Sequence, residues 1–211
     1  MRKWIGAVCL ILGVACLLGA VGFVFYNRWE ADRAEETTKS MLEEMQRVAK
    51  DKISIPSFDA AVEEDTLHSE PARPMEMATV KVDGYDCIGV LSIPVLELEL
   101  PVLTDWSYTK LKKAPCLYYG SYYEKDFVIA AHNFQSHFGR LSQLRSSDVV
   151  IFTDVTGTPY YYEVVLLETL PKEATEEMIT SGFDLSLYTC TTGGGNRVTV
   201  RCTSTSMNPN Q

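Results

Sequence analysis

Histidine and basic residues are scarce in this 211-residue chain. It has three histidines, and its 19 lysines and arginines are outnumbered by 28 aspartates and glutamates, for a net charge of −9. A nucleic-acid-binding surface needs a cationic patch, so this balance argues against nucleic acid as a partner. The six cysteines lack the paired spacing of a metal finger, and the chain has no internal repeat. We therefore expect no metal, no cofactor and no repeat architecture.

A long uncharged run follows the N-terminal Arg2 and Lys3. It covers Trp4–Tyr26, and at 1.5 Å per residue it spans about 34 Å, enough for a hydrocarbon core of about 30 Å. Basic residues stay on the cytoplasmic side, which predicts a single-pass anchor with the rest of the chain outside the cell. A cleaved signal peptide is the competing interpretation, and Gly13–Cys16 faintly resembles a lipoprotein cleavage site. The uninterrupted apolar run favours the uncleaved anchor.

The next segment, Glu30–Lys50, is charged and favours a helix. Its apolar positions recur at helical spacing, and they are Met41, Leu42, Met45 and Val48. We expect a solvated stalk helix with one apolar stripe. Asp51–Val82 contains three prolines and scattered acidic residues, which is typical of a linker. A role for this linker in covering the active site is a second interpretation.

From Cys87 onward the pattern changes to short apolar runs separated by turn residues. The predicted strands are Cys87–Ile93, Glu97–Leu103, Cys116–Tyr119, Phe127–His132, Val149–Thr153, Tyr160–Leu170, Leu185–Cys190 and Arg197–Cys202. Short helices are expected at Ser107–Lys112, Ser136–Leu144 and Lys172–Ser181. Eight such strands predict a mainly β domain, a closed or nearly closed β-barrel.

This pattern gives a domain organisation in four parts. The expected parts are a cytoplasmic tip and anchor (1–28), a helical stalk and linker (29–82), a catalytic domain (83–204) and a C-terminal tail (205–211).

Two of the predicted strands end in residues suited to acid–base and nucleophilic chemistry. Leu185–Cys190 ends in a thiol, beside a glycine-rich connection and a strand that begins with Arg197. A thiol at a strand end near a cation is better placed for reactivity than one in mid-core, although a buried structural cysteine is the commoner case. His132 closes another apolar strand. His68 lies in the polar linker, and His137 is expected at the surface.

This combination resembles the sortases, the cysteine transpeptidases of Gram-positive cell surfaces. Ser186-Leu187-Tyr188-Thr189-Cys190 matches their Thr-Leu-x-Thr-Cys strand, Arg197 matches the arginine that opens the next strand, and Ala131-His132 matches their Gly-His. Two positions depart from the family pattern: Ser186 replaces threonine and Ala131 replaces glycine. The resemblance covers roughly Cys87–Thr203, with its elements in the family order, and assigns no subgroup.

The resemblance implies an eight-stranded sortase barrel and a catalytic site of three residues. Cys190 would be the nucleophile, His132 the proton carrier, and Arg197 a hydrogen-bond donor to the substrate carbonyl or the oxyanion. Sortases cleave a Leu-Pro-x-Thr-Gly-like sorting signal, form a thioester and pass the acyl group to an amine. The implied partners are surface proteins or pilins, with an amine of a peptidoglycan precursor or a pilin lysine as acceptor.

Other reactive residues have simpler explanations. Strand alternation puts Arg201 on the face of Arg197, where it competes for the same role, but we expect it to be a solvent-facing cation. Cys87, Cys116 and Cys202 are expected to be buried free thiols, with an extracellular disulfide still open. The remaining polar candidates form two sets. Glu173, Glu176 and Glu177 fit a solvated helix face, although some sortases bind calcium there, and Tyr118, Tyr119, Tyr122 and Tyr123 fit either a groove or a core.

Two other functions compete with this interpretation: another kind of cysteine acyl-transfer enzyme and a binding domain without catalysis. Papain-like enzymes place cysteine before histidine, the reverse of the order here. The L,D-transpeptidases share the His-then-Cys order, but their cysteine follows Ser-His-Gly, which Leu187-Tyr188-Thr189 does not match. A catalytically silent, membrane-tethered binding domain on the same barrel is the other alternative, and the presence of Cys190, His132 and Arg197 together weighs against it.

Overall fold

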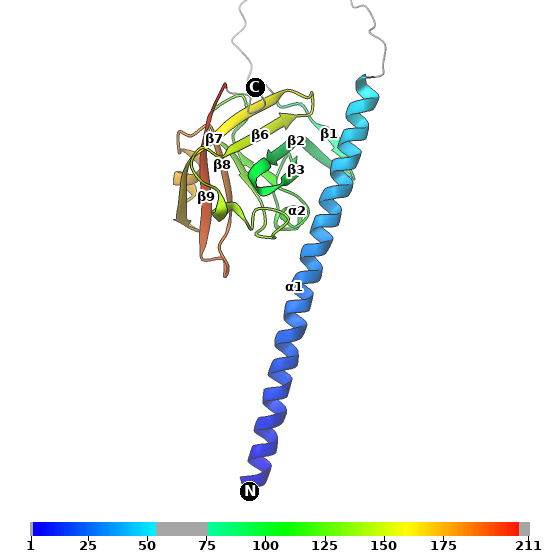
Figure 1. Cartoon of the computed structure of the whole chain (residues 1–211), viewed down its shortest axis with the longest axis vertical. Coiled ribbons are helices and arrows are strands. Elements are labelled where there is room, and N and C mark those ends of the chain that lie inside the picture. Colours follow the sequence, from blue (N-terminus) through cyan, green and yellow to red (C-terminus); the bar gives the residue numbers. More distant parts are fainter. Residues whose placement is uncertain (1, 54–75, 207–211) are drawn as a thin grey trace, which may run out of the picture.

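The computed structural model describes residues 2–53 and 76–206, and shows a β-barrel beside one long helix (Figure 1). The helices are α1 (Arg2–Ile53), α2 (Tyr108–Leu111) and α3 (Thr175–Ile179), with 3-10 turns η1 (Pro94–Leu96) and η2 (Leu141–Gln143). The strands are β1 (Val80–Val82), β2 (Tyr85–Ile93), β3 (Leu98–Leu103), β4 (Cys116–Tyr119), β5 (Phe127–Ala130), β6 (Val149–Asp154), β7 (Pro159–Pro171), β8 (Leu185–Cys190) and β9 (Asn196–Ser204).

Eight of these strands form a closed ring. The order is β2-β3-β4-β5-β8-β9-β7-β6, and β6 returns to pair with β2. Most neighbours are antiparallel, but β3–β4 and β5–β8 are parallel. Closure pairs the strand edges that an open sheet would expose to other chains. The predicted eight-stranded barrel is therefore confirmed.

Gly89 permits this closure. It sits in β2 opposite Asp154 of β6, and a Cβ at this position would lie 2.2 Å from the carbonyl oxygen of Thr153. A side chain here would push the two closing strands apart, so the position requires glycine. Inside the ring, alternate residues of every strand form one apolar core, in which Phe127, Phe152 and Leu187 are fully buried.

The strand predictions differ from the structure mainly at their ends. β7 and β9 each run slightly longer than expected, and β5 ends at Ala130, two residues before His132. One strand was missed: β1 lies in the segment interpreted as linker and pairs with β2 in antiparallel register. The expected helix over Ser136–Leu144 is mostly turns, with only η2 inside it. The linker at 54–75, including His68, lies outside the described residues.

The N-terminal region is one continuous helix, α1, with 52 residues. The sequence predicted an anchor followed by a stalk, and the structure joins both in a single rod (Figure 1). By length and composition, α1 is long and apolar enough to cross a membrane. Its apolar side chains from Leu10 to Tyr26 that are described are exposed.

The stalk half of α1 is not solvated all round, contrary to expectation. Met41 is fully buried and Met45 is 8% exposed, in a cluster with Val82, Cys87 and Leu103 of the barrel. The predicted apolar stripe is real, but it packs on the outer face of β1–β3 and not against water. Burial of such side chains stabilises the contact by roughly 2 kcal/mol each.

A buried polar contact lies within the same interface. The side chains of Thr38 and His137 meet at 3.1 Å between Oγ1 and Nε2, and His137 is fully buried. The expectation of a surface histidine was wrong, because α1 covers this loop of the barrel. Burial, with a smaller effect from the charge of His132, lowers the pKa of His137 to about 4.

This burial makes the stability of the folded chain depend on pH. An unfolded histidine binds a proton below about pH 6.5, whereas folded His137 resists protonation down to about pH 4. The free energy of unfolding should therefore fall as the pH drops through this window, by up to about 3 kcal/mol from this residue. Urea unfolding of the full chain in detergent micelles at pH 7 and pH 4.5 measures the loss.

His137→Gln is the matched control, because glutamine keeps a hydrogen-bonding side chain but does not titrate. The variant should lose clearly less stability than the native chain over the same pH interval. Equal losses in the two proteins would show that His137 does not titrate in this window.

Candidate active site

Two of the three residues predicted to carry the chemistry, Cys190 and Arg197, lie on neighbouring strands, and the third, His132, lies just after the strand on the other side of β8. β8 is the central one: its last residue, Cys190, stands directly opposite Arg197 of β9 in antiparallel register. On its other side β8 pairs with β5 in parallel, with Ala130 opposite Tyr188. Two residues further along that register, His132 follows β5 at the level where Cys190 ends β8.

Strand alternation also gives these residues the same face. Leu185, Leu187 and Val200 point into the core, so the residues between them point outward. Cys190 and Arg197 belong to the outward set, and His132 continues the outward parity of Ala130. The predicted site residues are thus brought to one end and one face of three adjacent strands.

Two hydrogen bonds hold the end of β5 to the end of β8. The backbone N–H of Ala131 donates to the carbonyl of Tyr188 at 3.2 Å, and the hydroxyl of Thr189 donates to the carbonyl of Ala131 at 2.9 Å. Thr189 is 3% exposed. The residues immediately before His132 and Cys190 are therefore fixed to each other.

The ring of His132 is oriented by packing. It stacks on Phe134 with ring centroids 3.9 Å apart, and Phe134 in turn contacts the buried His137. Burial lowers the pKa of His132, with opposing smaller effects from Glu30, which raises it, and Lys112, which lowers it. A lowered pKa keeps a larger share of the imidazole neutral at pH 7, which is the form that accepts a proton.

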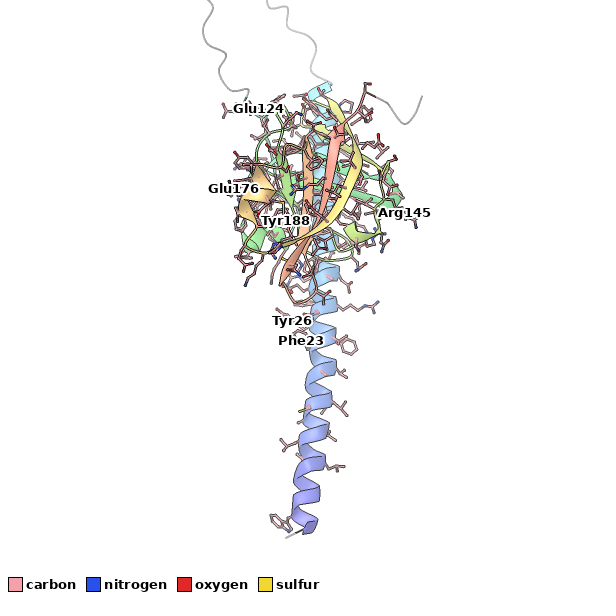
Figure 2. The ribbon with its side chains drawn as sticks, turned by 90° about the vertical axis from the view of Figure 1, so that its left-hand side faces the viewer. Phe23, Tyr26, Glu124, Arg145, Glu176 and Tyr188 are labelled. Carbon is pink, nitrogen blue, oxygen red and sulfur yellow. The ribbon has the colours of Figure 1, made fainter. Side chains whose placement is uncertain are left out.

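A groove runs beside Cys190 and Arg197. Its walls come from the β3–β4 connection, with Trp106, Tyr108 and Leu111, and from the β7–β8 connection, with Thr175 and Met178. Tyr118 and Tyr188 form its floor, in edge-to-face contact at 5.3 Å. We call this the Cys190 groove. Figure 2 shows this side of the barrel, with Tyr188 at its centre and Glu176 on the β7–β8 connection.

A second hollow meets the first at Cys190. It is formed by the loop after β5 and by the start of the β8–β9 connection, and includes Asn133, Gln135, Thr191 and Thr192. Cys190, which is exposed, borders both hollows, so two different molecules have routes to its sulfur.

Arg201 is not the expected solvent-facing cation. It is 2% exposed, and its guanidinium donates to Glu168 of β7 at 2.7 Å, Ser186 of β8 at 2.8 Å and the carbonyl of Glu177 in α3 at 2.7 Å. The β7–β8 connection covers this part of β9. The alternation of residues along the strand predicts which face Arg201 is on, but not that another segment covers that face. Arg201 thus fixes α3, a wall of the Cys190 groove, to the barrel.

The other described cysteines of the barrel are buried free thiols. Cys87, Cys116 and Cys202 are fully buried, and burial raises the pKa of each to about 12. Such thiols carry almost no thiolate at neutral pH and are poor nucleophiles. Exposure at a strand end distinguishes Cys190 from all three.

The remaining polar candidates separate by position. Glu173, Glu176 and Glu177 are exposed, and within residues 2–53 and 76–206 no three His, Cys, Asp or Glu side chains are grouped to hold a metal ion. Of the four tyrosines in question, Tyr118 lines the Cys190 groove, whereas Tyr122 and Tyr123 contact each other in an aromatic cluster elsewhere in the barrel. Sequence reasoning missed Trp106 and Tyr108, since nothing in their local pattern marks a groove wall.

Comparison with known proteins agrees with this fold. A family model described as "Sortase domain" matches residues 91–205. Similar solved structures include sortase C1 from Streptococcus suis (25% identity, TM-score 0.50, 59% of this chain and 76% of that one) and sortase A from Corynebacterium diphtheriae (20%, 0.53, 82% and 86%). A Clostridium perfringens sortase D5 transpeptidase is also similar (15%, 0.54, 81% and 97%). No curated protein matches the chain.

The two arginines of β9 should respond differently to the same substitution. Arg201→Met leaves the side chain of Glu168 and the carbonyl of Glu177 without their hydrogen-bond donor, so we expect the free energy of unfolding to fall by about 3 kcal/mol. Arg197→Met removes only weak bonds to backbone carbonyls, at 3.2 and 3.3 Å, and should change stability by less than about 1 kcal/mol. Denaturant unfolding of both variants measures the two changes. Equal losses of stability would show that the contacts of Arg201 with α3 and β7 do not stabilise the fold.

Proposed function

The chain belongs to the sortase family, and from this premise we propose that it is a membrane-anchored transpeptidase that cleaves a sorting signal of the Leu-Pro-x-Thr-Gly type in surface proteins or pilins. The observation that supports the proposal is the pairing of β8 with β5 and β9, which puts Cys190 opposite Arg197 and ties the residues just before Cys190 and His132 to each other. The acyl acceptor is an amine, either of a peptidoglycan precursor or of a pilin lysine.

In the first half-reaction the sulfur of Cys190 attacks the carbonyl carbon of the scissile peptide bond. A C–S bond forms and the C–N bond breaks, leaving a thioester on the enzyme and an amine as leaving group. The neutral imidazole of His132, whose pKa is lowered by burial, takes the proton of the Cys190 thiol. It then passes that proton to the leaving nitrogen, which departs as a neutral amine.

In the second half-reaction the acceptor amine replaces water as the nucleophile. It attacks the thioester, His132 takes up its proton, and the C–S bond breaks as the new C–N bond forms. Because the new amide resembles the bond that was broken, no external energy source is needed. The two hollows that meet at Cys190 support this reaction, one for the acyl donor and one for the amine.

Arg197 acts on the charge that develops in both steps. Its guanidinium stays protonated at any working pH, and its position opposite Cys190 suits a donor to the oxyanion or to a neighbouring substrate carbonyl. Among the described residues its guanidinium donates hydrogen bonds to the carbonyls of Gly194 and Asn196, and a substrate oxygen can replace these bonds. Loss of an oxyanion donor of this kind slows catalysis by roughly 10²–10³.

Membrane attachment is part of the same proposal. The uncharged run Trp4–Tyr26 forms the N-terminal half of α1, and the two basic residues before it favour a cytoplasmic N-terminus. The barrel then lies outside the cell, where sorting signals of exported proteins are accessible.

Thiol alkylation should separate an active enzyme from a silent barrel. At pH 7 the full chain in detergent micelles should be alkylated at Cys190 far faster than at Cys87 or Cys202, as read by peptide mass mapping. His132→Ala should slow the reaction at Cys190 by roughly tenfold or more, because the imidazole accepts the thiol proton. Glu124→Gln, at the opposite end of the barrel, is the control and should leave the rate unchanged. If His132→Ala has no effect on Cys190, the two groups do not act together.

Turnover is tested with a library of sorting-signal peptides and an amine acceptor, with products read by mass. We expect a new amide with at least one peptide, a thioester adduct on Cys190, and no product from Cys190→Ala. Arg197→Met should reduce the rate by roughly 10²–10³ while leaving the fold intact. A folded native chain that gives neither adduct nor product with any peptide would count against the enzyme assignment.

A further inference from the structure

The end of the apolar run is marked by aromatic and basic residues. Tyr26 and Trp29 lie with ring centroids 6.3 Å apart, and the guanidinium of Arg33 sits 4.9 Å above the Trp29 ring. Tryptophan, tyrosine and arginine gather where a membrane-spanning helix leaves the hydrocarbon core. This group therefore marks the outer boundary of the proposed anchor.

The barrel is attached to α1 immediately beyond that boundary. Lys112, next to α2, pairs with Glu30 of α1 at 2.5 Å. Glu30 is four residues beyond Tyr26, which corresponds to about 6 Å along the helix axis. The headgroup layer on each side of a bilayer is about 5–8 Å thick. The β3–β4 connection is therefore held at the height of the headgroups.

The candidate active site lies at the same end of the barrel. In both figures the tip of the β8–β9 hairpin extends toward the N-terminal half of α1, and in Figure 2 it ends close to the level of Tyr26. The charges of Glu30 and Lys112 both act on His132, which agrees with this placement. Glu124 lies at the opposite end (Figure 2).

The composition of this end fits a lipid surface. Trp106 and Tyr108 are 42% and 80% exposed, and they contact each other edge to face at 5.8 Å. The segment 105–113 has three lysines against one aspartate, and the hairpin segment 190–197 has one arginine and no acidic residue. Lys110 and Lys112 are paired with Asp105 and Glu30. Lys113 and Arg197, which form no ion pair within residues 2–53 and 76–206, supply the positive charge that an anionic bilayer attracts.

We propose that the end of the barrel formed by Trp106–Lys113 and Thr191–Arg197 rests in the headgroup layer of the membrane that holds α1, with Trp106 and Tyr108 inserted among the phospholipid headgroups. The Cys190 groove then opens at the bilayer surface. This inference rests on the anchor in the proposed function and deepens it.

The test uses tryptophan fluorescence, because the chain has three tryptophans, Trp4, Trp29 and Trp106, and one of them lies in the proposed contact. The full chain is reconstituted in phosphatidylcholine–phosphatidylglycerol vesicles whose acyl chains carry bromine close to the headgroups. Trp4→Phe together with Trp29→Phe leaves Trp106 as the fluorophore. We expect bromine to quench at least half of its emission relative to unbrominated vesicles.

Two further variants make the result decisive. Glu124→Trp, in a chain with all three native tryptophans replaced by phenylalanine, reports from the far end of the barrel and should show almost no quenching. Trp29→Phe with Trp106→Phe leaves Trp4, which should be quenched if α1 is inserted. If Trp4 is quenched but Trp106 is quenched no more than the Glu124→Trp reporter, the inference is overturned while the anchor stands. If Trp4 is not quenched, both the membrane anchor and the inference are overturned. Turnover of soluble peptides tests the proposed catalysis separately.

Discussion

The pairing of β8 with two neighbours at once is the constraint on which the site depends. Parallel pairing with β5 and antiparallel pairing with β9 bring the end of one strand, the residue after a second and the beginning of a third to the same level. Backbone hydrogen bonds between the strands fix the positions of Cys190 and Arg197, and the bond from Ala131 to Tyr188 fixes the backbone just before His132. A shift of register by one residue would turn Cys190 into the core.

Buried polar groups connect the outer elements to this frame. Arg201 joins three strands and α3 through its guanidinium, while Thr38 and His137 join α1 to the loop that carries His132. A buried hydrogen-bonded group allows few alternative arrangements, since any displacement leaves it without a partner. Both contacts therefore set where a wall of the site stands, in addition to their effect on stability.

The long helix α1 holds the barrel at one position along its length, and under the proposed function this position sets the distance of the barrel from the membrane. A flexible stalk would let the domain sample many distances from the membrane, whereas here Met41, Met45 and Glu30 attach the barrel along one side of the helix. Under the proposed function this restriction favours the reaction, since orientation and proximity replace part of the diffusional search for the two partners.

The sequence predicts the eight barrel strands and the long apolar helix from local periodicity, and it predicts the three site residues from a short motif that resembles a known family. It could not determine that the apolar stripe with Met41 packs on the barrel, that β1 exists, or that His137 and Arg201 are buried. Alternation tells which residues share a face, but what covers that face comes from segments distant in the chain. Those contacts could not be predicted from local patterns, because burial depends on how separate elements meet in space.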